Sequence, residues 1–388
     1  MLPLDGVKVM DLSHAAAGPC CTMLLADMGA EVIKIEPLGG ESFRFLLNGA
    51  FLMNLNRNKR GMALDLNSEE GKDIALRLVE QVDIFVESFT PGTMEKLGLD
   101  YDTVSRMNPM IIYCSVSGFG QTGPYRNRPS FDPIAQAMSG IMLATGEADR
   151  LPVRIMPPTI DYGTGILGAY GIAMALLNRE KNGKGQRIDV ALFDTAVFYM
   201  SQSIANYSLT GQLPVRMGSA ASSLAPYQVF RARDRLIFIG VYSDEAWEKF
   251  CQSLDLDELI RDPRYAVRDV RWQNRDELAT MLNQIFEQYD SEELLAKLVS
   301  VDIPCGPLLN IDEVIEDDQV IAREMIVDAD CPGAGSGKMV RTPVRFSDTV
   351  ARVKSQAPLL GEHTREILGE LGYGDAEISQ FARKGVIL

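Results

Sequence analysis

One aspartate, Asp161, stands where a proline-rich segment gives way to a long apolar stretch, in the sequence TIDYGTG at residues 159–165. An aspartate at the start of a helix commonly caps it by accepting hydrogen bonds from backbone N–H groups. The position also suits a functional carboxylate, because Gly163 and Gly165 leave room for a ligand to approach the backbone closely. The pattern therefore leaves both a helix cap and a reactive group open at this residue.

A basic loop is the second candidate for chemistry. Residues 54–60 read NLNRNKR and bring Arg57, Lys59 and Arg60 together in a chain whose formal net charge is −15. A strand is expected directly afterwards, at 61–66, and loops at one edge of a parallel sheet line its ligand crevice. The cluster suits either a bound anion or a solvated turn, and Lys34 and Lys96 are further candidates for the same anion.

The composition excludes several kinds of site. The chain has only two histidines, His14 and His363, and its six cysteines form no C-x-x-C pair. We therefore expect no metal site, and catalysis by carboxylates, backbone amides, lysine or arginine. The acidic charge argues against a nucleic-acid or membrane surface. The scattered cysteines and the lack of a signal-peptide pattern at Met1–Gly6 indicate a cytoplasmic protein.

The elements that must position these residues alternate along the first half of the chain. Apolar runs predict strands, and longer segments between them predict helices. The strands are expected at 7–12, 31–36, 61–66, 83–87, 110–115 and 186–192, and helices at 132–145 and from 159 to about 178. Alternation at this spacing predicts right-handed βαβ units with a parallel sheet, and hence an α/β fold.

The texture of the sequence changes after about residue 208. Residues 209–226 are rich in Gly, Pro, Ser and Ala and suit a linker or lid. A β-hairpin at 227–242 and amphipathic helices at 244–256, 275–289 and 291–299 predict a smaller α+β domain over 227–325. We therefore expect residues 1–208 to form the large domain and residues 326–388 to return to it.

Several segments together resemble the class III coenzyme A transferases, the CaiB/BaiF-like family of formyl-CoA transferase and of carnitine and bile-acid CoA transferases. Each segment is weak alone, but they occur in order across nearly the whole chain. They are LDGVKV (4–9), HxxAGP (14–19), GAEVIKIE (29–36), NRNKR (56–60), FTPG (89–92), DxxxG (161–165), KGQ (184–186), IPCGP (303–307) and PLLGEHT (358–364).

The resemblance implies a fold and a set of roles. The fold is a Rossmann-like large domain built from both termini with a small central domain, in an interlaced ring-like homodimer. Asp161 falls on the nucleophile that moves CoA from an acyl-CoA to a small organic acid, and no tightly bound cofactor is implied. Residues implied at the CoA substrate are Ala16 and Ala17 beside the thioester, and Leu64 to Asn67, Ser88, Phe89 and Lys96 along its length. The basic cluster of Arg57, Lys59 and Arg60 suits the same polyanionic ligand.

The departures from the family pattern narrow the function. Ala16 replaces a glutamine of formyl-CoA transferase, Pro37 replaces an arginine, and GSAASS at 218–223 replaces a run of glycines, so we expect an acid larger than formate or oxalate. An acyl-CoA racemase on the same fold is one alternative, but its proton-transferring histidine and glutamate correspond here to Phe131 and Ser243. A nicotinamide-dependent dehydrogenase is the other, and the chain lacks its G-x-G-x-x-G motif.

Overall fold

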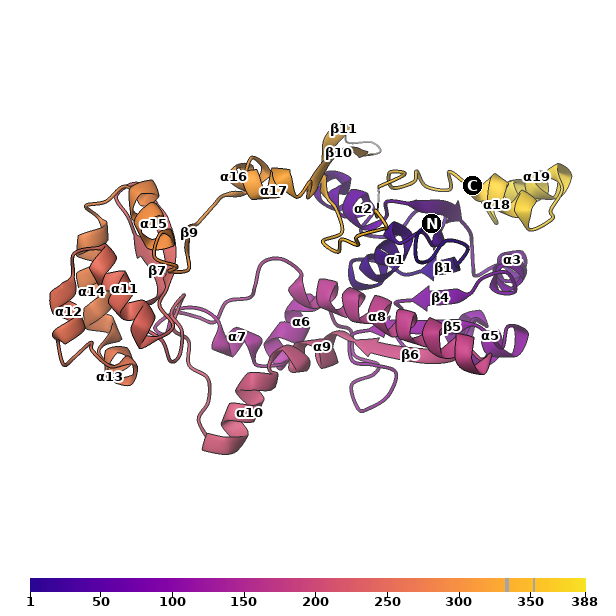
Figure 1. Cartoon of the computed structure of the whole chain (residues 1–388). Coiled ribbons are helices and arrows are strands. Elements are labelled where there is room, and N and C mark those ends of the chain that lie inside the picture. Colours follow the sequence, from indigo (N-terminus) through magenta and orange to yellow (C-terminus); the bar gives the residue numbers. More distant parts are fainter. Residues whose placement is uncertain (332–334, 352) are drawn as a thin grey trace. The chain divides into compact units, whose positions relative to one another are not determined.

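The computed structural model describes residues 1–331, 335–351 and 353–388 (Figure 1). The chain divides into two compact units. The first comprises Met1–Ile141, Arg154–Gln212 and Gln319–Leu388, and the second comprises Met142–Val153 and Leu213–Asp318. The first unit therefore contains both termini.

The segment Met142–Val153 corrects the expected division, which left it among the first 208 residues. It belongs to the second unit, where the N–H of Gly218 donates to the carbonyl of Gly146 at 3.0 Å. Nη2 of Arg216 also donates to the carbonyl of Ala148 at 3.2 Å. These bonds join residues far apart in the sequence, which local composition does not reveal.

A six-stranded parallel sheet forms the centre of the first unit (Figure 1). Its strand order is β3-β2-β1-β4-β5-β6, and every neighbouring pair is parallel. The strands are β1 (Lys8–Leu12), β2 (Glu31–Glu36), β3 (Lys59–Ala63), β4 (Ile84–Glu87), β5 (Ile112–Ser117) and β6 (Gln186–Ala191). The α/β class with a Rossmann-like parallel sheet is confirmed. From β1 to β3 successive strands are added on one side of β1, and from β4 onward they are added on the other side. In α/β sheets, ligands bind beyond the carboxyl ends of the strands at such a switch point.

Helices cover both faces of this sheet because alternate strand residues are apolar on both sides. In β1, Val9 joins one buried cluster and Met10 the other. The helices of the first unit are α1 (Ala17–Asp27), α2 (Ala50–Leu55), α3 (Glu69–Val79), α4 (Thr93–Leu97), α5 (Tyr101–Met107), α6 (Asp132–Met138), α8 (Thr159–Asn182), α9 (Leu192–Tyr199), α10 (Ser201–Thr210), α18 (Thr364–Glu370) and α19 (Asp375–Arg383). A short helix, α17 (Asp318–Ala322), lies at the boundary, and a hairpin of β10 (Ile326–Cys331) and β11 (Gly335–Val340) follows.

The helix expected over 132–145 is two helices. The first is α6, and the second is α7 (Ile141–Ala144). Gly140 between them has a φ of 93°, which lies outside the helical region. The break ends α6 after two turns and lets the chain pass into the second unit.

The second unit has its own antiparallel sheet, in the order β7-β8-β9. The strands are β7 (Tyr227–Arg231), β8 (Leu236–Gly240) and β9 (Cys305–Pro307), and the hairpin turns at Arg233 and Asp234 as expected. The helices are α11 (Asp244–Ser253), α12 (Asp257–Arg261), α13 (Arg268–Gln273), α14 (Arg275–Phe286), α15 (Ser291–Val299) and α16 (Ile311–Ile315). Trp247, Phe250 and Phe286 pack at the centre of its core.

Candidate active site

Two loops meet at the switch point of the sheet. The first is the turn from β1 into α1, and the second follows β4. The backbone N–H of His14 donates to Oγ of Ser88 at 2.9 Å, and Nδ1 of His14 lies 3.1 Å from the same oxygen. The rings of His14 and Phe89 are 5.1 Å apart between centroids. The two loops are therefore in direct contact at the carboxyl edge of the sheet.

The amino-terminal end of α1 lies at this point. Gly18 is required there, because a Cβ would stand 2.3 Å from Cβ of Ser13 and 3.2 Å from Cβ of Ser88. No side chain in the described part of the molecule caps the helix. Among the described residues, the N–H groups of Ala17 and Gly18 have no protein acceptor. Free amides at the positive end of a helix dipole form a ready site for a negatively charged oxygen.

Asp161 lies in the first turn of α8, the helix that connects β5 to β6. Because β5 and β6 are parallel, α8 must begin at the carboxyl edge of the sheet, where α1 also begins. Gly165 lets the two helices touch, since a Cβ there would stand 2.6 Å from the carbonyl oxygen of Ala17. Sγ of Cys20 also lies 4.0 Å from the carbonyl oxygen of Tyr162. The fold therefore brings Asp161 to the same edge as the free amides of α1.

The amino-terminal cap of α8 comes from a different residue, Asp132. Its Oδ2 accepts the N–H of Ile160 at 2.7 Å and that of Asp161 at 3.2 Å. Nε2 of Gln136 donates to Oδ1 of Asp132 at 2.5 Å, and Oε1 of Gln136 accepts the N–H of Ile155 at 2.9 Å. The helix end is thus satisfied without Asp161, which leaves that carboxylate free for another task. Sequence reasoning missed this role of Asp132, because an aspartate that opens one helix gives no local sign that it caps another.

The electrostatics of Asp161 suit a nucleophile. Within the described part of the chain, its carboxylate accepts no hydrogen bond from the protein. Burial, followed by the nearby charge of Asp132, raises the pKa of Asp161 to about 7. A carboxylate that is poorly solvated and carries no hydrogen bonds keeps its electron pairs available for attack.

The other residues expected at CoA follow strands at the same edge of the sheet, but not all of them are accessible. Leu64 and Asn67 follow β3, and Ser88, Phe89 and Lys96 follow β4. Asn67 and Lys96 are exposed. The side chain of Leu64 is buried in the core, so it offers a ligand no surface, and its N–H is taken by the carbonyl of Glu36.

The basic cluster requires a correction. Nη2 of Arg57 lies 2.7 Å from Oδ2 of Asp27, and Nζ of Lys59 lies 2.9 Å from Oδ2 of Asp11, with all four side chains at most 3% exposed. These cations are neutralised inside the fold and are not free to bind phosphate.

Arg60, the third member of the cluster, is also paired. Its guanidinium contacts Glu31 at 2.6 Å, and Glu366 and Glu370 at 2.8 Å each. Lys34, the further candidate, is fully buried and paired with Glu41 at 3.3 Å. Of the basic residues named for an anion, Lys96 alone is exposed and has no ion pair among the described residues.

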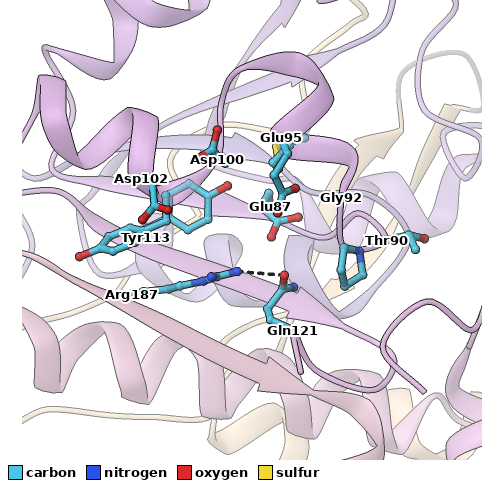
Figure 2. A pocket seen from close by; sticks show the side chains of 12 residues that line it. Glu87, Thr90, Gly92, Glu95, Asp100, Asp102, Tyr113, Gln121 and Arg187 are labelled. Carbon is cyan, nitrogen blue, oxygen red and sulfur yellow. Dashed lines mark hydrogen bonds between the residues drawn. The ribbon is translucent and has the colours of Figure 1, made fainter. Parts of the chain in front are cut away.

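An acidic cavity of about 80 Å³ lies beside the β4 loop, and Asp161 does not line it (Figure 2). The carboxylates of Glu87, Glu95, Asp100 and Asp102 line it, together with the guanidinium of Arg187, which donates to Oε1 of Gln121 at 2.9 Å. Glu87 is 3% exposed, and its Oε2 accepts the N–H of Phe89 at 2.9 Å. Burial raises the pKa of Glu87 to about 7.

This raised pKa predicts how stability depends on pH. Folded Glu87 keeps its proton up to about pH 7, whereas the unfolded residue loses it near 4.5, so the free energy of unfolding falls as the pH rises between these values. Glu87→Gln removes this penalty and keeps an oxygen acceptor for the N–H of Phe89. We expect the variant to be more stable than wild type at pH 8, by up to about 3 kcal/mol, and equally stable at pH 4.

Urea unfolding at the two pH values measures the difference. Glu95→Gln is the matched control, because Glu95 lines the same cavity but is exposed, and it should change stability at neither pH. A gain for Glu87→Gln of equal size at pH 4 and pH 8 contradicts the assignment.

Known proteins match this sequence over nearly its whole length. The model of CoA-transferase family III matches residues 4–364. Succinyl-CoA:mesaconate CoA-transferase of Haloarcula hispanica is 38% identical, covering 96% of this chain and 97% of that protein. Succinyl-CoA:glutarate CoA-transferase of Mus musculus is 37% identical, covering 100% and 91%.

Solved structures agree with the sequence matches. A CaiB/BaiF family protein from Brucella suis has a TM-score of 0.87 and 38% identity, covering 95% of this chain and 99% of its own. A protein of Mycobacterium tuberculosis has a TM-score of 0.85 and 29% identity, with the same coverage. The sequence matches and the structural matches thus point to the same family. The chain is an enzyme of CoA-transferase family III.

Proposed function

We propose that this enzyme transfers CoA from an acyl-CoA to a free carboxylic acid through covalent intermediates on Asp161. One observation carries the proposal. The half-buried carboxylate of Asp161 accepts no hydrogen bond among the described residues, and its helix begins at the sheet edge where the free amides of Ala17 and Gly18 also lie. The carboxylate supplies a nucleophile, and the amides supply hydrogen bonds to an oxygen that becomes negative during acyl transfer.

The reaction proceeds by exchange at carbonyl carbons. An oxygen of Asp161 attacks the thioester carbonyl of the donor, the C–S bond breaks and CoA thiolate leaves, so that a mixed anhydride forms. The thiolate then attacks the carbonyl of Asp161, which releases the donor acid and leaves an aspartyl-CoA thioester. The acceptor carboxylate repeats these steps in reverse, and the energy of the thioester is conserved throughout.

We propose contacts to CoA from residues that lie along the carboxyl edge of the sheet. Ala16 and Ala17 border the thioester, Ser88 and Phe89 lie along the pantetheine, and Asn67 and exposed Lys96 lie toward the nucleotide. Leu64 is left out of this set, because the residue is buried and its N–H already donates to the carbonyl of Glu36. Arg57, Lys59 and Arg60 are left out of this set, since each is already paired with carboxylates.

The substrate class is a larger organic acid than formate or oxalate. The relatives named above act on succinyl-CoA with mesaconate or glutarate, and a further relative, from Chloroflexus aurantiacus, is a succinyl-CoA–D-citramalate CoA-transferase that is 36% identical. We therefore propose succinyl-CoA as the donor and a dicarboxylic acid of four or more carbons as the acceptor.

A transfer assay in heavy water tests the proposal. Succinyl-CoA is incubated with a panel of dicarboxylic acids, and products are identified by mass. We expect new CoA thioesters without deuterium at the α-carbon, because transfer leaves that carbon untouched. A chiral 2-methylacyl-CoA without acceptor acid serves as the racemase probe. Enzyme-dependent deuterium uptake without CoA transfer would overturn the proposal in favour of the racemase, although Phe131, 57% exposed before Asp132, carries no proton to transfer.

The raised pKa of Asp161 predicts the pH profile. Only the ionised carboxylate attacks, so kcat/KM should fall about tenfold for each pH unit below about 7. Because the charge of Asp132 contributes to this raised pKa, Asp132→Asn should move the acidic limb to lower pH. Initial rates between pH 5 and 9 measure both profiles. A flat wild-type profile down to pH 5 contradicts the assignment of Asp161 as the group that must ionise.

We also propose that two copies of the chain associate as an interlaced homodimer. Within the described residues, α8 is the one helix long and apolar enough to span a membrane, but one side of it packs on α1 through Gly165 and Gly168. The other side exposes apolar residues at helical spacing, namely Tyr162, Ile166, Tyr170, Met174 and Leu177. A second copy that covers this stripe explains both its apolarity and the absence of buried residues in α10.

Dilution tests this assembly. Interlaced chains have no stable folded monomer, so sedimentation and circular dichroism should show loss of dimer and loss of fold together. A folded monomer at low concentration contradicts interlacing. For location we propose the cytoplasm, in keeping with the free thiols of Cys20, Cys21, Cys114, Cys251 and Cys305.

A further inference from the structure

Ala15, in the turn between β1 and α1, has a backbone conformation that alanine rarely adopts. Its φ is +61°, in the left-handed region where Cβ crowds the following carbonyl and which glycine adopts without penalty. The chain has alanine rather than glycine here, in the turn that leads into α1 and its free amides. Strained backbone persists only where surrounding structure holds it, and such strain gathers at functional sites.

The side chain that holds this turn is Glu41. Its Oε2 accepts the N–H of Ala15 at 2.8 Å, and its Oε1 lies 3.3 Å from Nζ of Lys34. Nζ of Lys34 also donates to the carbonyl of Ser13 at 3.0 Å. The two side chains are 6% and 0% exposed. One buried ion pair therefore forms hydrogen bonds to the backbone on both sides of His14.

A second buried charge fixes the start of the turn. Oδ1 of Asp11 accepts the N–H of Ser13 at 2.9 Å and its hydroxyl at 2.5 Å. Burial alone would raise the pKa of Asp11, but Lys59, Lys34, Ser13 and Thr22 together lower it to about 2. Asp11 therefore holds Ser13 as a carboxylate at neutral pH, and among the described side chains Glu41 is the one that accepts the N–H of Ala15.

The direction of the α1 amides depends on this turn. Ala15 is followed by Ala16, the amino-terminal cap residue, and then by Ala17 and Gly18 with their free N–H groups. Gly18 is pressed against Ser13, so the turn has no room to adjust. Rotation of Ala15 into the right-handed region turns the peptide planes that follow it, and the amides then point elsewhere.

We propose that Glu41, paired with Lys34, is a positioning residue that holds Ala15 in its left-handed conformation and so aims the amides of α1 at the acyl oxygen. The proposal rests on the function proposed above, since it concerns the same site. It identifies a residue that touches neither substrate nor Asp161 and acts only through the backbone.

A double-mutant cycle tests it. Glu41→Ala should lower kcat about 100-fold with the KM for acyl-CoA nearly unchanged, the size expected when one oxyanion donor is lost. Ala15→Gly alone should leave kcat within about threefold. In the double variant, glycine adopts the left-handed conformation without help, so kcat should recover at least about tenfold over Glu41→Ala. A residue needed only for general stability would show no such rescue.

Controls keep every outcome decisive. Glu377→Ala removes a comparable 2.9 Å bond between a carboxylate and a backbone N–H, at Gly374 before α19, and should leave kcat unchanged. If Glu41→Ala does not fold, Glu41→Gln carries the test: its amide oxygen still accepts the N–H of Ala15, so kcat should stay within about threefold of wild type, and a loss of about 100-fold in this variant overturns the positioning role. If wild type transfers CoA but Ala15→Gly does not restore the kcat of Glu41→Ala, the positioning role alone is overturned. Inactive wild type overturns the proposed function together with it.

Discussion

Asp161→Asn should lower kcat by at least about 10⁴-fold while CoA binding is retained. The amide has the shape of the carboxylate but lacks the anionic oxygen that attacks the thioester, and removal of a nucleophile leaves only binding and oxyanion stabilisation. Folding should be unaffected, because the side chain of Asp161 makes no hydrogen bond among the described residues and Asp132 caps α8. Removing this half-buried carboxylate, whose pKa is raised by burial, should even stabilise the variant slightly at neutral pH and above.

Trapping gives the direct measurement. Wild type incubated with succinyl-CoA and hydroxylamine should acquire a hydroxamate on the peptide that contains residue 161, and the variant should not. Asp194→Asn is the matched control, because Asp194 also lies in the first turn of a helix, α9, and is exposed. Substantial transfer by Asp161→Asn, or a hydroxamate on another carboxylate, removes Asp161 from the nucleophilic role.

The sheet was predictable because its strands are short apolar runs with helices between them. The strand at 31–36 has the expected bounds, and the strand expected at 61–66 begins two residues earlier, at Lys59. Local pattern also placed the start of α8 and the hairpin of the second unit. These features depend on neighbours in sequence, so a single sequence contains the information for them.

The charges at the site were not predictable in the same way. Arg57 is paired with a residue 30 positions earlier and Lys59 with one 48 positions earlier, so the basic cluster resembled a ligand site when its members were neutralised in the fold. The cap of α8 comes from Asp132, 28 positions before the N–H that it accepts. Contacts between residues distant in the sequence determine which carboxylate is left without a hydrogen bond. The local sequence pattern does not indicate these contacts.

Gly165 illustrates a residue whose meaning changed once the fold was known. In the sequence it offered space for a ligand, but in the structure the space is occupied by α1. A Cβ at this position would stand 2.6 Å from the carbonyl oxygen of Ala17 and 2.7 Å from Cβ of Cys20. Backbone cannot yield as a flexible side chain does, so Gly165→Ala must push α8 away from α1 and move Asp161 with it.

We expect Gly165→Ala to lower kcat about 100-fold, the loss that follows when reacting groups are displaced by about 1 Å. Gly171→Ala in the same helix is the control, because its Cβ meets nothing nearer than Cγ2 of Ile188 at 3.3 Å. That variant should keep its activity within about twofold, because the nearest atom belongs to a side chain that needs to shift by only a few tenths of an ångström. Circular dichroism and thermal unfolding of both variants establish that Gly165→Ala is folded when its rate is measured. Equal activity of the two variants would mean that the contact between α1 and α8 does not set the position of the nucleophile.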